Sequence, residues 1–293
     1  MGILVGMKGA FLQAVDACST LSPDPLLPLK QHLRALGASP ASGRGELRLC
    51  SSGSRVAFLV NSVWRGLHLA HTFLTTLPFP HVGEIRDGEF AKASGYYPAV
   101  GWTLGILLAV AAWLTSSLPS GVGAALVLAL WLGLTGMLHF DGLVDASDAV
   151  LATKTPLERL EILSDVHIGA FGLAVGVMQL LTKWSALNAH PNFLAIITTP
   201  VLARAALLIP TNIFPAARVE SLGARAREGN WQVGLLIAAP AILLNPKGAI
   251  VAVITALVVS SFAARRLGGG IGGDVYGSVV ELCETTILIA TFV

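Results

Sequence analysis

PAVGWTLGILLAVAAWLTSSL, residues Pro98–Leu118, contains no Asp, Glu, Lys, Arg or His. A transmembrane α-helix needs about 20 consecutive, mostly apolar residues, so this run is long enough to cross a bilayer. Six further apolar runs follow it: Gly121–Leu138, Ala170–Leu187, Asn192–Ile213, Gln232–Leu244, Gly248–Ala263 and Val275–Val293. The pattern predicts an all-α, polytopic integral membrane helix bundle with about seven transmembrane helices.

The composition of the whole chain agrees with a lipid environment. Of the 293 residues, 54% are hydrophobic and 12% are charged, whereas soluble domains carry about 25% charged residues. The formal net charge is +2, so the concentrated basic surface of a nucleic-acid-binding protein is absent. Cys18, Cys50 and Cys283 are too few and too scattered for a disulfide framework or a zinc site. An ordinary soluble enzyme, a disordered chain and a nucleic-acid partner are therefore disfavoured.

The first 60 residues have a different texture from the rest. Pro, Ser and Gly interrupt them repeatedly, and no helical period persists. We expect a poorly ordered extension over residues 1–60, which is either a targeting segment or the product of an upstream start codon. The membrane-embedded domain is expected over residues 61–293. It begins with an amphipathic first helix within Val56–Leu77, which carries Arg65, His68 and His71.

The basic residues are sorted between the two ends of the predicted bundle. One side receives the connections 78–97, 139–169, 214–231 and 264–274, and the other receives 119–120, 188–191, 245–247 and the C-terminus. Among these connections, the first side holds nine Lys or Arg residues and the second holds only Lys247. Because cytoplasmic loops carry an excess of Lys and Arg, the first side is predicted to be cytoplasmic.

An acidic segment, HFDGLVDASD at His139–Asp148, lies on this first side. Spacings of four and three place Asp141, Asp145 and Asp148 on one face if the segment is helical. Neighbouring carboxylates repel one another unless a cation lies among them, and Mg2+ prefers carboxylates together with substrate phosphates. The segment therefore predicts a Mg2+ site for a phosphorylated substrate, with a solvated polar loop as the alternative.

Other polar residues offer further candidates. DVHIGAFG at Asp165–Gly172 and the glycine-rich turn ending in Gly273-Asp274 each lead into an apolar run, where backbone N–H groups can approach a phosphate. Arg204 is the one charge in the middle of a predicted span, and its partner is either a carboxylate, Glu281 or Glu284, or a substrate phosphate. His139 is either a phosphate contact or an interior residue.

Together these motifs resemble those of the cobalamin synthases, the adenosylcobinamide-GDP ribazoletransferases. The resemblance covers roughly residues 64–293 and rests on an ordered set of short motifs: TFLTTLP at Thr72–Pro78, YPAVG at Tyr97–Gly101, HFDGLVDASD at His139–Asp148, DVHIGAFG at Asp165–Gly172 and GDVYG at Gly273–Gly277. The chain departs from the family pattern at Ala149, Ser164, Val166 and Gly272, where the family usually has Gly, Lys, Ser and Thr.

The resemblance implies an integral membrane, Mg2+-dependent transferase of the last steps of cobalamin biosynthesis. Such an enzyme joins adenosylcobinamide-GDP to alpha-ribazole or its 5'-phosphate and releases GMP. On this basis Asp141, Asp145 and Asp148 are expected to hold Mg2+, and Asp165 or Asp274 to complete the site or act as base. The expected substrate contacts are Arg204, His139, His167 and Gly273.

Two other classes of membrane protein remain as alternatives. A CDP-alcohol phosphotransferase also carries aspartates after a span, but this chain has Asp145-Ala146-Ser147 where that pattern has Ala-Arg. A transporter would place Arg204 and Glu281 in a translocation path, but transporters often show internal repeats and none is visible. The expected partners are the two small-molecule substrates and membrane lipid, and the sequence leaves the oligomeric state open.

Overall fold

The structure is a computed structural model that describes residues 52–80, 82–85, 88–217 and 229–292. The expectation of a poorly ordered extension over residues 1–60 falls almost wholly outside these residues and stays a prediction. Contact clustering places Phe58–Val293 in one compact unit, and this unit is described below.

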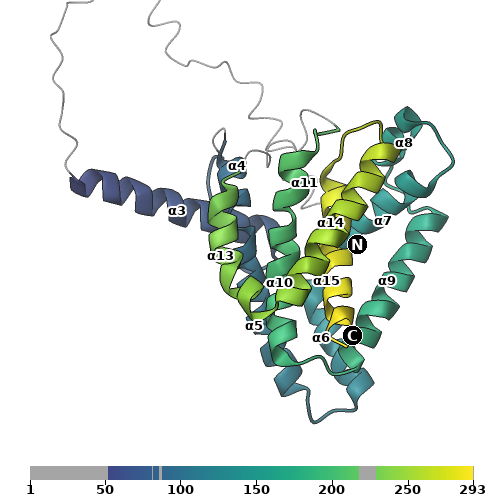
Figure 1. Ribbon diagram of the computed structural model, residues 1–293, viewed down its shortest axis with the longest axis horizontal. Helices are drawn as coiled ribbons and strands as arrows, with labels where there is room; N and C mark the ends of the chain where they lie inside the picture. Colours follow the sequence, from purple (N-terminus) through teal and green to yellow (C-terminus); the bar gives the residue numbers. More distant parts are fainter. Residues whose placement is uncertain (1–51, 81, 86–87, 218–228, 293) are drawn as a thin grey trace, which may run out of the picture. The chain divides into compact units, whose positions relative to one another are not determined.

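Helices are the regular secondary structure of the described residues, and turns and loops connect them. The one β feature among these residues is an isolated bridge between Ala216 and Ile271. The all-α expectation is confirmed (Figure 1). The helices are α3 (Ser52–Leu74), α4 (Glu89–Ser94), α5 (Tyr97–Leu114), α6 (Ser120–Leu134), α7 (Leu138–Leu151), α8 (Pro156–Ile162), α9 (Ala170–Asn188), α10 (Phe193–Ala206), α11 (Leu208–Ile213), α13 (Trp231–Leu244), α14 (Pro246–Arg266) and α15 (Gly273–Ala290).

The membrane class is supported, but the count of seven spans is not confirmed. By length and apolar composition, four described stretches are able to cross a membrane: α5, α9, α10 with α11, and α14. A fifth is added if α6 and α7 form one broken span. The remaining two predicted runs fall short for physical reasons, because α13 has only 14 residues and α15 carries Asp274, Glu281 and Glu284.

A sharp bend separates α6 from α7. The two helix axes meet at 87°, and Gly136 and Met137 between them both have a φ of 58°, in the left-handed region that disfavours most side chains. Thr76 joins this bend from the segment after α3: its N–H donates to the Leu134 carbonyl at 2.8 Å and its hydroxyl to the Gly133 carbonyl at 2.8 Å. The segment treated above as part of a loop, 139–169, therefore begins as a helix.

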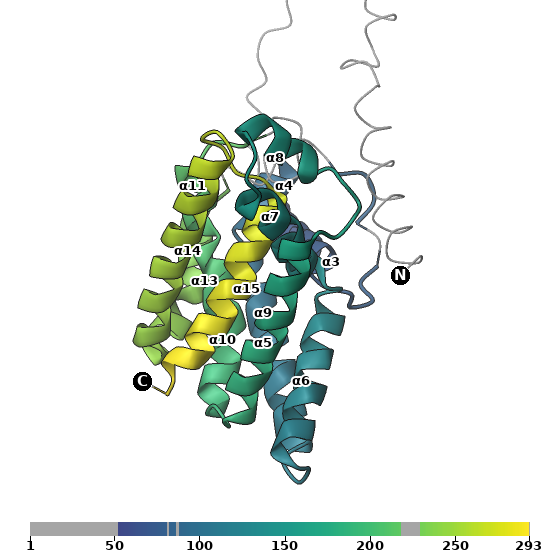
Figure 2. The same cartoon turned by 90° about the vertical axis from the view of Figure 1, so that its right-hand side faces the viewer.

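Helix α15 lies in the middle of the bundle. It packs against α7, α9, α10 and α14, and twelve of its residues are buried. Figure 1 shows it behind α14, and Figure 2 shows it between α14 and α9. A helix buried on most of its surface is expected to be apolar all round, so the acids of α15 need partners inside the protein.

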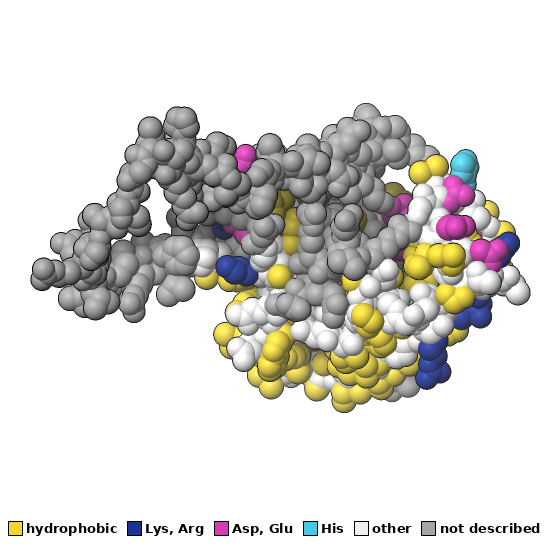
Figure 3. Space-filling view, turned by 90° about the horizontal axis from the view of Figure 1, so that it is seen from above, with side chains coloured by type: hydrophobic (Ala, Val, Ile, Leu, Met, Phe, Trp, Pro, Cys, Tyr) yellow, Lys and Arg dark blue, Asp and Glu magenta, His cyan; other side chains and the backbone are white. Residues whose placement is uncertain are grey.

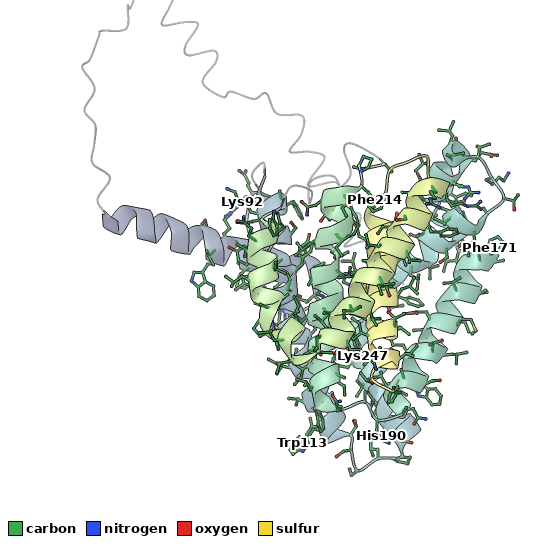
Figure 4. All side chains as sticks on the ribbon, viewed as in Figure 1. Lys92, Trp113, Phe171, His190, Phe214 and Lys247 are labelled. Carbon is green, nitrogen blue, oxygen red and sulfur yellow. The ribbon has the colours of Figure 1, made fainter. Side chains whose placement is uncertain are left out.

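The loops gather at two opposite ends of the unit, as the sorting of the basic residues requires. Figure 4 shows Lys92, Phe171 and Phe214 toward one end and Trp113, His190 and Lys247 toward the other. Figure 3 looks onto the first end and shows acidic side chains gathered beside a histidine at one edge. The acids and histidine in and after α8 are Glu158, which is half-buried, and Glu161, Asp165 and His167, which are exposed. We call this the acidic end of the bundle.

Helix α5 packs against α10 at a distance that only glycine permits. A Cβ on Gly105 would lie 2.2 Å from the Ile197 carbonyl oxygen, and a Cβ on Gly101 would lie 2.5 Å from the Cα of Val201. Both atoms that would clash belong to the backbone, so no side-chain rotation relieves them. Close approach through small residues is the usual way that helices associate in membranes.

Gly105→Ala is therefore expected to destabilise the protein by about 1–3 kcal/mol, the usual cost of overpacking. The thermal unfolding midpoint of the detergent-solubilised full chain measures this effect. Gly133→Ala is the matched control, because a Cβ at that exposed helical position meets nothing within 4 Å. Equal midpoints for the two variants would contradict the close packing of α5 on α10.

Candidate functional site

Helix α7 carries the three aspartates of the acidic segment. Asp141 is exposed, Asp145 is half-buried and Asp148 is buried. Asp141 and Asp145 are four residues apart, so they lie on the same face one turn from each other. The sequence predicted a shared face for these aspartates only if the segment is helical, and the structure shows that it is.

Asp148 binds the backbone at the start of α9. Its two carboxylate oxygens accept hydrogen bonds from the N–H groups of Gly169 at 2.7 Å and Gly172 at 2.8 Å. A carboxylate at this position satisfies donors that have no partner within the helix and interacts favourably with the helix dipole. A Cβ on Gly172 would lie 2.2 Å from one of these oxygens, so glycine is required there. Asp148 thus joins the acidic motif to the Asp165–Gly172 motif.

The Gly273–Gly277 motif meets the same helix. A Cβ on Gly142 would lie 3.0 Å from the Asp274 carbonyl oxygen, and a Cβ on Gly277 would lie 2.8 Å from the His139 carbonyl oxygen. The first turn of α15 and the first turn of α7 are therefore in backbone contact, with Asp274 half-buried at this junction and Gly273 exposed at the helix start. No atom lies within 4 Å of a Cβ built on Gly273, so this position is open to a ligand.

Two arginines hold the other end of α7. Arg159 donates to the Val150 carbonyl at 2.8 Å, and Arg266 donates to the carbonyls of Val150 at 2.9 Å and Ala152 at 3.1 Å. These are carbonyls that a helix leaves unsatisfied at its C-terminus, where cations are also favoured by the dipole. The role was not predicted from the sequence, in which both arginines counted only toward the charge of one side.

Asp165 and His167 form an exposed pair on the segment before α9. The His167 Nδ1 lies 2.6 Å from Asp165 Oδ1, and the His167 N–H donates to the same oxygen at 3.1 Å. The hydrogen bond from the His167 side chain lowers the pKa of Asp165 below its ordinary value. Asp165 is therefore ionised at neutral pH, and its contact with His167 is lost only as the pH falls through that lowered pKa. A lowered pKa makes a carboxylate a weaker proton acceptor. This favours Asp165 as a negative charge that completes the site over Asp165 as the general base.

A cluster of four charged side chains lies inside the bundle, and we call it the buried charge cluster: Lys183 of α9, Arg204 of α10, and Glu281 and Glu284 of α15. The Lys183 ammonium lies 3.0 Å from Glu281 and 2.5 Å from Glu284, and Arg204 lies 2.8 Å from Glu284. All four side chains are at most 3% exposed.

Neutral partners complete the cluster. The Trp131 indole N–H of α6 donates to Glu284 at 3.2 Å, and the Lys183 ammonium lies 4.3 Å from the centre of the Trp131 ring. Gln179 donates to the Glu281 carboxylate at 3.2 Å and to the Thr285 hydroxyl at 2.7 Å. Arg204 therefore takes the carboxylate partner of the two alternatives. The partners of Lys183 were not predicted from the sequence, although a lysine within an apolar run is a signal of buried pairing.

His139 is an interior residue, 4% exposed. Neither ring nitrogen has a hydrogen-bond partner among the described residues. The charged groups that act on it electrostatically are Arg204, Glu284 and Lys183, so His139 stands between the buried charge cluster and the junction of α7 with α15.

Only some of the predicted metal ligands are arranged in a way that fits Mg2+. Within the described residues, no group of three or more His, Cys, Asp or Glu side chains is arranged to hold a metal ion. Mg2+, however, is usually bound by one or two carboxylates together with substrate phosphates. Asp141 and Asp145 fit that smaller set because they share a face of α7. Asp148 caps the start of α9 with both of its carboxylate oxygens.

Asp148→Ala is therefore expected to destabilise the protein by about 1–2 kcal/mol, as loss of a helix cap does. Asp148→Asn retains one accepting oxygen and is expected to lose less. Neither change is expected to alter Mg2+ affinity, which calorimetry on the full chain measures alongside thermal unfolding. A stable Asp148→Asn protein that no longer binds Mg2+ would instead make Asp148 a metal ligand.

Comparison with known proteins gives a consistent family. Residues 66–292 match the family described as cobalamin-5-phosphate synthase. A protein of Deinococcus radiodurans named adenosylcobinamide-GDP ribazoletransferase is 52% identical over 227 residues, which cover 77% of this chain and 84% of that protein. Proteins of the same name are 36% identical in Desulfitobacterium hafniense, over 78% of this chain and 96% of that protein, and 35% identical in Novosphingobium aromaticivorans, over 77% and 95%.

No solved structure matches the chain. The family match spans the motifs from Thr72 to Gly277. The structure brings four of the five together around α7 and the α6–α7 bend, whereas the Tyr97–Gly101 motif lies on α5, where Gly101 packs against α10. The resemblance inferred from those motifs is confirmed: the chain belongs to the cobalamin-5-phosphate synthase family.

Proposed function

We propose that this chain joins adenosylcobinamide-GDP to alpha-ribazole or its 5'-phosphate at the acidic end of its helix bundle, releasing GMP. A ribose hydroxyl attacks the phosphorus that is linked to cobinamide. The new P–O bond forms as the bond to the GMP oxygen breaks, and the hydroxyl proton passes to a base. The product is adenosylcobalamin or its 5'-phosphate. Family membership favours this reaction over CDP-alcohol transfer or transport.

The observation that carries the proposal is the meeting of distant motifs at α7. Asp148 binds Gly169 and Gly172, Gly142 contacts Asp274, and Thr76 binds the bend from which α7 begins. Phosphoryl transfer depends mainly on alignment and charge stabilisation. The carboxylates and the exposed glycine backbone at this place are carried on packed helices. They can therefore supply both the alignment and the charge stabilisation.

Individual residues take different roles in this proposal. Asp141 and Asp145 would hold Mg2+, which would neutralise charge on the diphosphate. Asp274 is the preferred base, because it is half-buried beside α7, whereas the pKa of Asp165 is lowered by His167. Gly273 and His167 are exposed and would contact the substrates. Arg204 and His139 are buried and would act through the position of α15 and α7.

The acidic end is proposed to face the cytoplasm. The connections predicted on the first side hold nine Lys or Arg residues in the sequence, against Lys247 alone on the other, and such an excess marks cytoplasmic loops. Adenosylcobinamide-GDP and alpha-ribazole 5'-phosphate both carry charged phosphate groups, so they do not cross a bilayer unaided. Inverted vesicles are therefore the preparation in which the site is accessible from outside.

Asp141→Asn and Asp145→Asn are each expected to reduce transfer by about 100-fold, because a carboxylate that binds Mg2+ supports charge stabilisation of several kcal/mol. Inverted vesicles containing the full chain receive adenosylcobinamide-GDP, alpha-ribazole 5'-phosphate and Mg2+. GMP and corrinoid product are followed together, and chelation of Mg2+ with EDTA is expected to stop both.

The control is Glu161→Gln, a change at an exposed acid of α8, which is expected to keep wild-type activity. Near-wild-type GMP release by both aspartate variants would refute the metal assignment. Absence of product from correctly inserted wild-type protein would refute the proposed reaction. Equal activity in sealed right-side-out vesicles would refute the orientation alone.

A further inference from the structure

An apolar pocket lies on the side of the bundle formed by α10, α11, α13 and α14. Its volume is about 410 Å3, and its lining is almost entirely carbon. Ala205 of α10, Trp231 and Ile242 of α13, and Ala249 of α14 are among the residues that line it. Neither the acidic segment of α7 nor the glycine motif of α15 contributes to this lining, so the pocket is separate from the proposed transfer site.

We propose that this pocket holds one acyl chain of a membrane phospholipid. It opens on a helix surface that carries large exposed apolar side chains: Ile213, Leu235, Leu236, Leu243, Ile250 and Val253. In a membrane protein such a surface faces lipid tails. A cavity of this size that opens there is filled by the apolar groups next to it, because water finds no polar partners inside.

The length of the pocket fits one leaflet of the bilayer. Trp231 and Ile242 line it eleven residues apart on α13, which corresponds to roughly 16 Å of helix. The hydrocarbon core of a bilayer is about 30 Å thick, so one leaflet contributes about 15 Å. Helix α13 itself, with 14 residues, is roughly 21 Å long, which is shorter than the full hydrocarbon core.

The polar groups of the pocket gather toward one end. Asn212 lies in the last turn of α11 and Trp231 in the first turn of α13, whereas Leu202, Ile242, Ala249 and Val253 supply carbon further along. Trp231 is 52% exposed. Tryptophan is enriched at the level of lipid headgroups, so this end suits the glycerol and phosphate of a lipid, with the acyl chain directed along α13.

The test uses the full chain extracted from membranes in a mild detergent and examined by native mass spectrometry. A species carrying one phospholipid is expected at high occupancy. Ala249→Phe from α14 and Ala205→Phe from α10 fill the pocket from opposite walls. Each is expected to weaken lipid binding by about tenfold in Kd, which corresponds to about 1.4 kcal/mol and is read from the lipid-bound fraction.

Ala125→Phe on the exposed face of α6 makes the same change away from the pocket, and it is expected to leave the bound lipid in place. Retention of the lipid by both filling variants, with folding confirmed by thermal unfolding, would overturn the proposal. Displacement of the lipid by alpha-ribazole 5'-phosphate would also overturn it, since the pocket would then belong to the substrate. The proposed reaction does not depend on the bound lipid. Measuring transfer activity in the filling variants therefore tests the reaction separately from lipid binding.

Discussion

The structure depends on the pairing of charges inside an apolar bundle. Lys183, Arg204, Glu281 and Glu284 are all excluded from solvent, and an unpaired ion in such surroundings costs many kcal/mol. Two cations and two anions compensate each other only while α9, α10 and α15 hold their present registers. Trp131 extends the same requirement to α6 through its contacts with Glu284 and Lys183. Charge compensation therefore fixes the axial positions of α6, α9, α10 and α15 relative to one another. Apolar packing alone does not impose this constraint.

The proposed site follows from this constraint. Because Glu281 and Glu284 fix α15 along its axis, the start of that helix reaches α7, where Gly142 and Gly277 allow backbone contact. Helix α7 is itself held at its C-terminal end by Arg159 and Arg266. Asp141 and Asp145 of α7 and Asp274 of α15 are consequently carried on helices that buried contacts hold in place. Catalytic groups carried on rigid elements keep their geometry better than groups on loops.

Local patterns in the sequence predicted the helical membrane class, the acidic helix face and the family. Apolar runs as long as Pro98–Leu118 have one common explanation, and the ordered motifs were specific as a set. The 87° bend at Gly136 and Met137 was not predicted, because a left-handed backbone conformation within an apolar run has no clear sequence signal. The capping role of Asp148 and the pairing of Lys183 were missed because their partners lie 21 to 101 residues away.

The most direct test of the account is the free energy of unfolding of Lys183→Met, Glu281→Gln and the two combined. Lys183→Met leaves the buried charge cluster with an excess anion and is expected to destabilise the protein by about 3–5 kcal/mol. Adding Glu281→Gln restores neutrality, so the double variant is predicted to recover more than half of that loss and to regain transfer activity with it. A double variant as unstable as the sum of the two single changes would contradict the claim that charge compensation positions α15.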